Sequence, residues 1–315
     1  MVVTLDTTTL SGSPRAIAGG EPPRRRSRRN DRSAYIFLLP WFGGMLLTVV
    51  PFGISLYLAF TDYNLLTPPT FTGFENIERM ISDPKLHQSL AVTFTYTFIS
   101  VPLSLAAALA VAVLLNKGIR GLSIYRSVFY LPSLLGSSVA VVMLWSAIFG
   151  ADGIITRFLA FFGVQAGSLI QNPDTALGVL ISLQVWTFGA PMVIFLAALR
   201  QVPTMYYEAA SVDGAGRWRQ FRSITLPLIS PVIFFNLVLA MIGALQTFTQ
   251  GYVMSNGSGG PANSTLFYNL YLYQQGFTGF DMGYASAMAW MLLIIIAAFT
   301  GINFFAQRYW VHYES

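Results

Sequence analysis

The sequence predicts an all-α integral membrane protein with six transmembrane helices. Of its 315 residues, 54% are hydrophobic and only 10% are charged, a composition far more apolar than that of soluble domains. Six runs of 21–26 residues contain no charged side chain, and each is long enough to cross a hydrocarbon core of about 30 Å as a helix. The absence of cysteine excludes disulfides, thiol catalysis and Cys-based metal sites.

The first 33 residues are polar and carry three prolines and a run of arginines. Such a segment buries too little apolar surface to fold alone, so residues 1–33 are predicted to be a disordered basic cytoplasmic tail and residues 34–315 the membrane domain. The run Tyr35–Phe60 is 26 residues long, which exceeds the roughly 7–15 apolar residues of a signal peptide. It is therefore predicted to be an uncleaved first span.

Five further spans are predicted in order along the chain. They are Leu90–Leu115, Val128–Phe149, Ala176–Leu199, Leu228–Phe248 and Tyr284–Phe305. Several contain prolines, which membrane helices tolerate where neighbouring helices or waters satisfy the freed carbonyls.

The distribution of Lys and Arg predicts the orientation. With the tail inside, 15 of the 18 basic residues lie on the cytoplasmic side, and without the tail the ratio is still 8 to 3. Because cytoplasmic loops are enriched in Lys and Arg, both termini and the loop between spans four and five are predicted to be cytoplasmic. This topology also accounts for the net charge of +5 without a nucleic-acid partner.

Several functions are disfavoured by what the sequence lacks. No G-x-x-x-x-G-K-[ST] motif is present, so the chain has no P-loop to hold nucleotide phosphates. The six spans contain no ionisable residue, which counts against a secondary transporter, since these usually need one for ion coupling. His87 and His312 are predicted on opposite sides of the membrane. No catalytic, metal or cofactor site is therefore predicted in this chain.

The polar loop 203–227 has the most specific pattern in the sequence. It contains Glu208-Ala-Ala, three residues, Gly214, nine residues, and then Ile-x-Leu-Pro227. Pro203 ends the preceding span, a short helix over Met205–Asp213 follows, and Gly214 can close it with a left-handed cap. The small alanines allow the helix to enter a groove on a partner. An ordinary interfacial loop whose arginines meet lipid phosphates is the alternative.

This pattern resembles the EAA loop of permease subunits in binding-protein-dependent ABC importers. The segments Ser55–Pro69, Gly73–Pro84, Tyr125–Pro132 and Gly259–Pro261 are similar to carbohydrate-importer permeases, as is Gly283–Ala287 (GYASA). The resemblance implies the type I ABC importer permease fold in a bacterial or archaeal plasma membrane. It implies as partners a second homologous permease, a dimeric ATPase that holds ATP and Mg, and an external substrate-binding protein. The residues that would dock the ATPase are Glu208, Ala209, Ala210, Asp213 and Gly214.

The implied substrate is a sugar or oligosaccharide. A non-carbohydrate solute such as a polyol phosphate is the first alternative, and a secondary transporter is the second. Polar and small residues in spans four and five are candidates for the substrate pathway, and helix–helix packing is the competing interpretation. In span five the spacing predicts one continuous helix face. The candidates are Gln184, Trp186, Thr187, Asn236, Gly243, Gln246, Thr247 and Gln250.

Overall fold

The computed structural model of the protein describes residues 31–118, 121–136, 138–164 and 167–312. The predicted tail falls outside the described residues up to residue 30, so its disorder stays a prediction. The chain divides into two units, residues 1–52 and 53–315. Helix α1 (Asp31–Leu58) begins in the first unit and ends in the second.

The six predicted spans are confirmed within the described residues as five long apolar helices and one bent helix pair. They correspond to α1, α3 (Pro84–Leu115), α5 (Val139–Phe149) with α6 (Ile154–Phe161), the pair α7 (Pro173–Trp186) and α8 (Gly189–Gln201), α10 (Arg217–Gln220) with η1 (Phe221–Thr225) and α11 (Leu226–Leu245), and α14 (Met282–Ala306), which ends in η3 (Gln307–Tyr309).

Two of the predicted spans are broken. The run expected to be continuous over Val128–Phe149 forms α4 (Leu122–Leu135) and then α5, and the candidate span in this region is Val139–Phe161. The reason is local, because Ser138 accepts a hydrogen bond from the Val141 N–H and so caps a new helix. The fourth span bends by 41° between α7 and α8.

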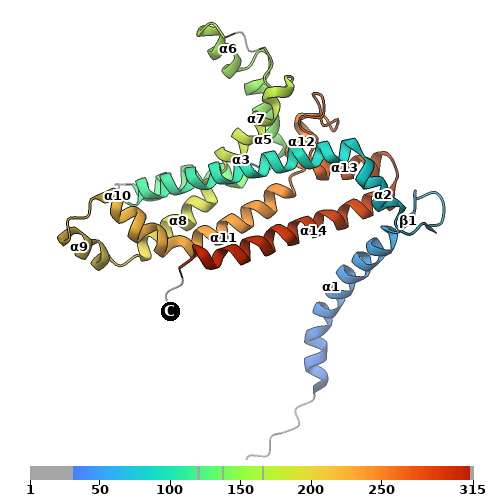
Figure 1. The fold of residues 1–315 in the computed structure, drawn as a ribbon, viewed down its shortest axis with the longest axis horizontal. Coiled ribbons are helices and arrows are strands. Elements are labelled where there is room, and N and C mark those ends of the chain that lie inside the picture. The colour runs from blue at the N-terminus through green and yellow to red at the C-terminus, as the bar shows by residue number, and fades with distance from the viewer. Residues whose placement is uncertain (1–30, 119–120, 137, 165–166, 313–315) are drawn as a thin grey trace, which may run out of the picture. The chain divides into compact units, whose positions relative to one another are not determined.

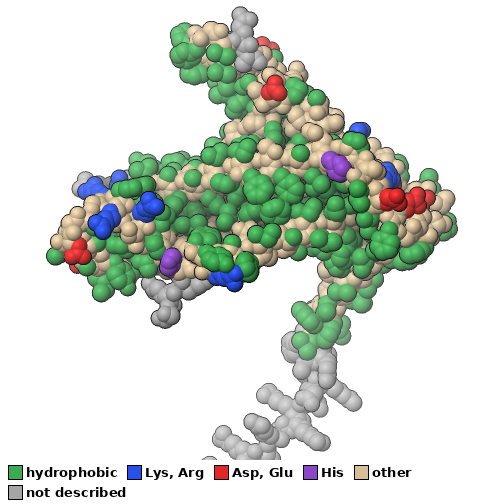
Figure 2. All heavy atoms as spheres, viewed as in Figure 1, with side chains coloured by type: hydrophobic (Ala, Val, Ile, Leu, Met, Phe, Trp, Pro, Cys, Tyr) green, Lys and Arg blue, Asp and Glu red, His purple; other side chains and the backbone are tan. Residues whose placement is uncertain are grey.

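The long helices of the second unit pack around α3, which contacts α7, α8, α11 and α13 (Tyr268–Tyr273). In Figure 1, α3, α11 and α14 run side by side. A buried row of small hydroxyl residues on α3 permits this close approach. Its members are Ser89, Thr93, Thr97, Ser100 and Ser104. Figure 2 shows apolar side chains covering the middle of these helices, while most charged side chains on this face lie toward their ends.

The two ends of the helices in the second unit carry different elements. One end bears α9 (Thr204–Val212) and α10, and the other bears α2 (Glu75–Ser82), the strands and α13 (Figure 1). The antiparallel strands are β1 (Thr61–Asp62) and β2 (Thr70–Phe71). The remaining elements are α12 (Thr249–Met254) and the π-helix η2 (Gln274–Thr278).

Asn76 and Gly283 belong to two of the sequence segments named above, and both pack against the turn at β1. The Asn76 side chain donates to the carbonyls of Ala59 and Thr61 at 3.0 and 2.9 Å. A Cβ on Gly283 would lie 2.1 Å from the Thr61 oxygen, so only glycine allows α14 to start this close to β1. These contacts fix the turn that follows α1 against α2 and α14.

Candidate functional site

Helix α9 (Thr204–Val212) lies within one residue of the predicted Met205–Asp213 at each end. Val202 is extended (ψ 120°), as a residue before proline tends to be, and it separates α8 from α9. At the other end Gly214 has a φ of +75°. The Gly214 N–H bonds to the Ser211 carbonyl at 3.1 Å and the Ala215 N–H to the Ala210 carbonyl at 2.9 Å. These two bonds form a Schellman cap, which satisfies carbonyls that the last helical turn leaves unpaired.

The inner side of α9 is tied to the elements that follow it. The hydroxyls of Tyr207 and Thr225 are 2.9 Å apart, and Thr225 belongs to η1, which leads directly into α11. The Gln220 side chain donates to the Ser211 hydroxyl at 2.9 Å and to the Ala215 carbonyl at 3.0 Å. The helix is therefore held to α10 and η1 by side-chain hydrogen bonds.

The outer side of α9 is open. Met205, Glu208, Ala209 and Val212 share one helix face by their spacing, and all four are exposed, Val212 by 90%. Within the described part of the chain the one ion pair joins Arg79 and Asp281 at the opposite end, so Glu208 has no ionic partner there. The result is an apolar face that carries one unpaired acid.

The five predicted docking residues fall into three places. Glu208 and Ala209 lie on the outer face, and Gly214 forms the cap. Ala210 and Asp213 instead line a pocket of about 200 Å³ together with Arg219 from α10. Sequence reasoning did not identify Met205 and Val212 as surface residues, although their i, i+7 spacing with Ala209 between them was the available signal.

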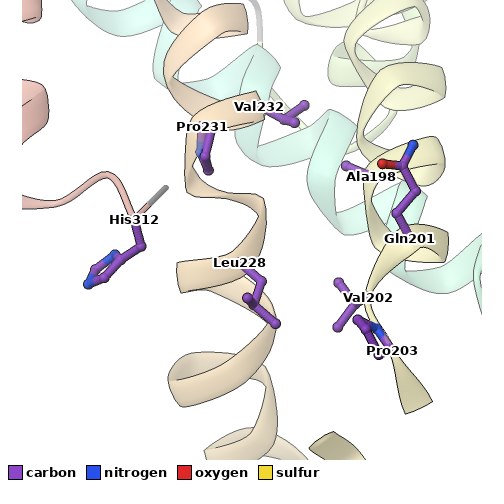
Figure 3. Close-up of a pocket in the computed structure, with 8 residues that line it drawn as sticks. All are labelled: Ala198, Gln201, Val202, Pro203, Leu228, Pro231, Val232 and His312. Atoms are coloured by element: carbon purple, nitrogen blue, oxygen red, sulfur yellow. The ribbon is translucent and has the colours of Figure 1, made fainter. Parts of the chain in front are cut away.

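A second hollow lies at the base of α9. Figure 3 shows it between the end of α8 and the first turns of α11, with Gln201, Val202 and Pro203 on one side and Leu228 and Pro231 on the other. Its volume is about 290 Å³. The backbone N–H of His312 donates to the Ser230 hydroxyl at 2.9 Å and so fixes the C-terminal segment beside this hollow.

The two sets of predicted pathway residues meet at a buried tyrosine that sequence reasoning missed. Tyr96 on α3 is fully buried, and its hydroxyl donates to the Gln184 side chain on α7 at 3.2 Å. Thr247, just beyond α11, is also buried and lies next to Tyr96. Tyr96 lies in an apolar run without any special motif, so no sequence signal distinguished it.

The break in the fourth span places Thr187 and Trp186 against α4 and α5. Thr187 caps the end of α7, and a Cβ on Gly136 would lie 2.0 Å from its Cγ2. The Trp186 ring lies 5.1 Å from that of Trp145. Trp186 also lines an apolar pocket of about 400 Å³ that α4 completes. The two breaks, Gly136 in one span and Thr187 in the other, are therefore in contact.

The expectation of one continuous helix face in span five was wrong beyond Gly243. Helix α11 ends at Leu245, because the Gln246 and Thr247 N–H groups bond three residues back, to the Gly243 and Ala244 carbonyls. Gln250 belongs to α12, a separate helix.

The remaining predicted pathway residues differ in exposure. Asn236 is buried, and its side chain donates to the Val232 carbonyl of its own helix at 2.8 Å. Gly243 and Gln246 are exposed, and a Cβ on Gly243 would meet nothing within 4 Å. Gly243 thus lies at an open position on α11, whereas the Asn236 side chain is buried and hydrogen-bonded within its own helix.

No metal centre is formed by the residues that the structure describes, because no three His, Asp or Glu side chains gather there.

Comparison with known proteins places this geometry in a family. Residues 90–311 match the family described as the binding-protein-dependent transport system inner membrane component. The chain is 51% identical over 294 residues to the probable ABC transporter permease protein YesP of Bacillus subtilis (strain 168), a match that covers 92% of this chain and 95% of that protein. It is 32% identical over 243 residues to the lactose transport system permease protein LacF of Rhizobium radiobacter, covering 76% and 81% of the two chains.

A solved structure shares the fold. It is a chain of a bacterial alginate ABC transporter in complex with an alginate pentasaccharide-bound periplasmic protein, with a TM-score of 0.73, 21% identity, and coverage of 88% of this chain and 94% of that one. The chain belongs to the binding-protein-dependent transport system inner membrane component family and is a multi-pass ABC importer permease subunit.

Proposed function

We propose that this chain is the permease subunit of an ATP-driven importer for a sugar or oligosaccharide, and that α9 is the element through which a separate ATPase moves it. The observation that carries this proposal is the two-sided character of α9. Its inner face is hydrogen-bonded to η1 and α10 through Tyr207 and Gln220, while its outer face is exposed and apolar around Glu208. A helix held in this way transmits a displacement of its partner into the transmembrane helices.

The partners of this chain follow from that role. A dimeric ATPase carrying ATP and Mg binds on the cytoplasmic side, with one copy on α9. A second, homologous permease completes the pathway, and an external binding protein delivers the substrate. The chain itself carries no P-loop and hydrolyses no ATP. Both termini face the cytoplasm of a bacterial or archaeal cell, as the excess of Lys and Arg on that side supports.

The pathway runs along the residues that surround Tyr96. Gln184 accepts a hydrogen bond from this tyrosine and Thr247 lies next to it, and Thr187 lies where two broken spans touch. Broken helices at membrane depth leave backbone groups free to bind substrate. ATP-driven closure of the ATPase would shift α9, and the bend between α7 and α8 would change which side the pathway opens to.

The proposal is tested by purifying the tagged full chain from native membranes and identifying every associated chain by mass spectrometry. We expect a second six-span permease and a P-loop ATPase. Glu208→Lys should lose the ATPase while it keeps the second permease. Glu78→Lys is the matched control, because Glu78 is an exposed acid on α2 at the opposite end, and it should retain both partners. Recovery of the chain alone, or as a homodimer without an ATPase, would contradict the proposal and favour a secondary carrier.

A further inference from the structure

Four aromatic rings form a continuous cluster at the end of the molecule opposite α9. Phe248 lies 5.3 Å from Tyr252 and 5.3 Å from Tyr273, measured between ring centroids. Tyr252 and Tyr273 are 5.6 Å apart, and Tyr273 stacks on Phe277 at 5.2 Å with an angle of 23° between the rings. These four residues, from α12, α13, η2 and the link after α11, are called the aromatic ladder below.

The backbone behind the ladder is closely packed. A Cβ on Gly276 would lie 3.0 Å from the Ala285 Cβ of α14, so η2 rests directly on that helix. A Cβ on Gly251 would lie 2.5 Å from the Phe267 ring, so α12 is pressed against the segment before α13. With these inner contacts filled, the rings next to them remain open, Phe277 by 59% and Tyr252 by 38%.

Free polar groups accompany the ladder. The Asn269 side chain donates to the Gln246 carbonyl at 2.8 Å and so joins the end of α11 to α13. Within the described residues, the side-chain amides of Gln246 and Gln250 and the hydroxyls of Tyr252 and Tyr273 have no hydrogen-bond partner. The segment therefore offers donors and acceptors beside exposed ring faces.

The whole segment is uncharged. No Asp, Glu, Lys, Arg or His occurs between Arg222 and Asp281. This segment supplies no cation to an anionic ligand such as a polyol phosphate, and Arg79 at the same end is already paired with Asp281, whereas anion sites are normally built with Arg or Lys. The chemistry of the segment suits a neutral ligand with both apolar faces and many hydroxyls.

We propose that the aromatic ladder is a binding site for neutral oligosaccharides at the external entrance of the pathway. Sugar rings present C–H faces that cover aromatic rings, and their hydroxyls bond to amides and phenols. Phe248, the first ring of the ladder, follows Thr247 in the chain, and Thr247 is buried next to Tyr96. This inference rests on the proposed import function and deepens it by selecting neutral over acidic sugars.

An interfacial belt is the competing explanation for these aromatics, since Tyr and Trp gather at membrane surfaces. A belt requires neither ring-to-ring contact nor free amides, and it predicts that replacing Phe277 with leucine leaves sugar binding unchanged. The two explanations therefore differ in how they respond to a change of side chain at Phe277.

The test is saturation-transfer NMR of the tagged full-length complex in nanodiscs with a panel of five ligands. The panel contains neutral glucose, xylose and galactose trimers, a galacturonate trimer, and glycerol 3-phosphate. We expect transfer to at least one neutral trimer and none to the acidic ligands. Phe277→Leu and Tyr252→Leu should each weaken sugar binding about threefold to tenfold. Phe277→Tyr, which keeps an aromatic ring at this position, should bind sugar as tightly as wild type. Phe71→Leu is the matched control, because Phe71 is exposed by 71% on β2, outside the ladder.

Each other outcome contradicts the inference. Equal signals from wild type and Phe277→Leu would mean that the rings are belt residues, and transfer to no neutral trimer would mean that the ladder binds no sugar. A variant that binds sugar normally but loses affinity for the external binding protein would identify a protein-docking surface instead. Any of these three results would contradict the sugar site alone, provided that the ATPase still co-purifies with the wild-type chain. Absence of the ATPase from the wild-type preparation would contradict the proposed function itself.

Discussion

The Tyr207 hydroxyl of α9 lies 2.9 Å from the Thr225 hydroxyl, and this bond joins the candidate coupling helix to the start of α11. Thr225 is buried, so the bond is protected from water. Among the described residues, the other side-chain hydrogen bond from α9 to a neighbouring element joins Ser211 and Gln220. The Tyr207–Thr225 contact therefore links α9 by a side chain to η1, which continues into α11.

Tyr207→Phe should weaken coupling without disrupting assembly. Loss of one hydrogen bond costs about 0.5–1.5 kcal/mol, so we expect substrate uptake to fall severalfold while the ATPase still co-purifies. Tyr206→Phe is the matched control, because Tyr206 is an exposed neighbour on the same helix. Uptake by membrane vesicles at equal protein level measures the effect. Equal uptake by the two variants would remove Tyr207 from the coupling route.

Gly214 should be required in the cap of α9 for its left-handed backbone conformation, since there is room for a side chain at this position. A Cβ on Gly214 would meet nothing within 4 Å, but its φ of +75° is left-handed, which costs a non-glycine residue about 1–2 kcal/mol. Gly214→Val should therefore reduce ATPase binding, and Gly214→Asn should largely retain it, since Asn tolerates this region. Co-purified ATPase per permease is the measurement. Equal loss in both variants would point to a surface contact at Gly214.

Two glycines of the broken fourth span should respond in opposite directions. A Cβ on Gly189 would lie 2.1 Å from the Phe129 oxygen of α4, whereas a Cβ on Gly178 would meet nothing within 4 Å. Gly189→Ala should therefore lower the thermal unfolding temperature. Gly178→Ala should leave it unchanged or raise it, since alanine favours a helix by up to about 1 kcal/mol. Equal stability of the two variants in nanodiscs would contradict the close packing of α8 on α4.

The sequence predicted the number of spans because apolar length alone determines whether a helix can cross a membrane. It also located α9, because Pro203 and Gly214 act locally on the backbone. Hydropathy did not predict the breaks near Gly136 and Thr187, because the Ser138 cap lies inside an apolar run and the contact between Gly136 and Thr187 joins distant segments. For the same reason hydropathy did not distinguish Tyr96, whose importance comes from its partners on α7 and beyond α11.

Gly243 and Thr247 should respond differently to a bulky substitution. Gly243 is exposed with open space around it, whereas Thr247 is buried beside Tyr96. Gly243→Leu should leave folding intact, so any loss of uptake would come from the pathway or the second permease. Thr247→Leu should lower stability as well as uptake, because it overfills a packed site by an amount that typically costs about 1–3 kcal/mol. Thermal unfolding and uptake measured together separate the two effects, and normal stability of Thr247→Leu would contradict this assignment.

Asp83 should stabilise the end of the helices that bears α2 and α13 in a pH-dependent way. Its carboxylate accepts hydrogen bonds from the Tyr271 and Tyr284 hydroxyls at 2.6 and 2.7 Å, and it caps α3 through the Lys85 and Leu86 N–H groups. Burial acts to raise the pKa of Asp83, but these four hydrogen bonds outweigh it and hold the pKa below the ordinary 3.8. A carboxyl whose pKa is lowered by folding contributes stability above its unfolded pKa, and that contribution disappears as the pH falls through the lowered value.

Asp83→Asn should therefore lower the unfolding temperature by an amount that is constant above about pH 5 and shrinks as the pH falls below 3.8. The measurement is thermal unfolding in nanodiscs at pH 7, 5 and 3. Asp62→Asn serves as the control, because Asp62 is an exposed acid in β1 at the same end. A deficit in Asp83→Asn that persists unchanged at pH 3 would show that the amide disturbs packing, and that the charge of Asp83 contributes little to holding α3, α13 and α14 together.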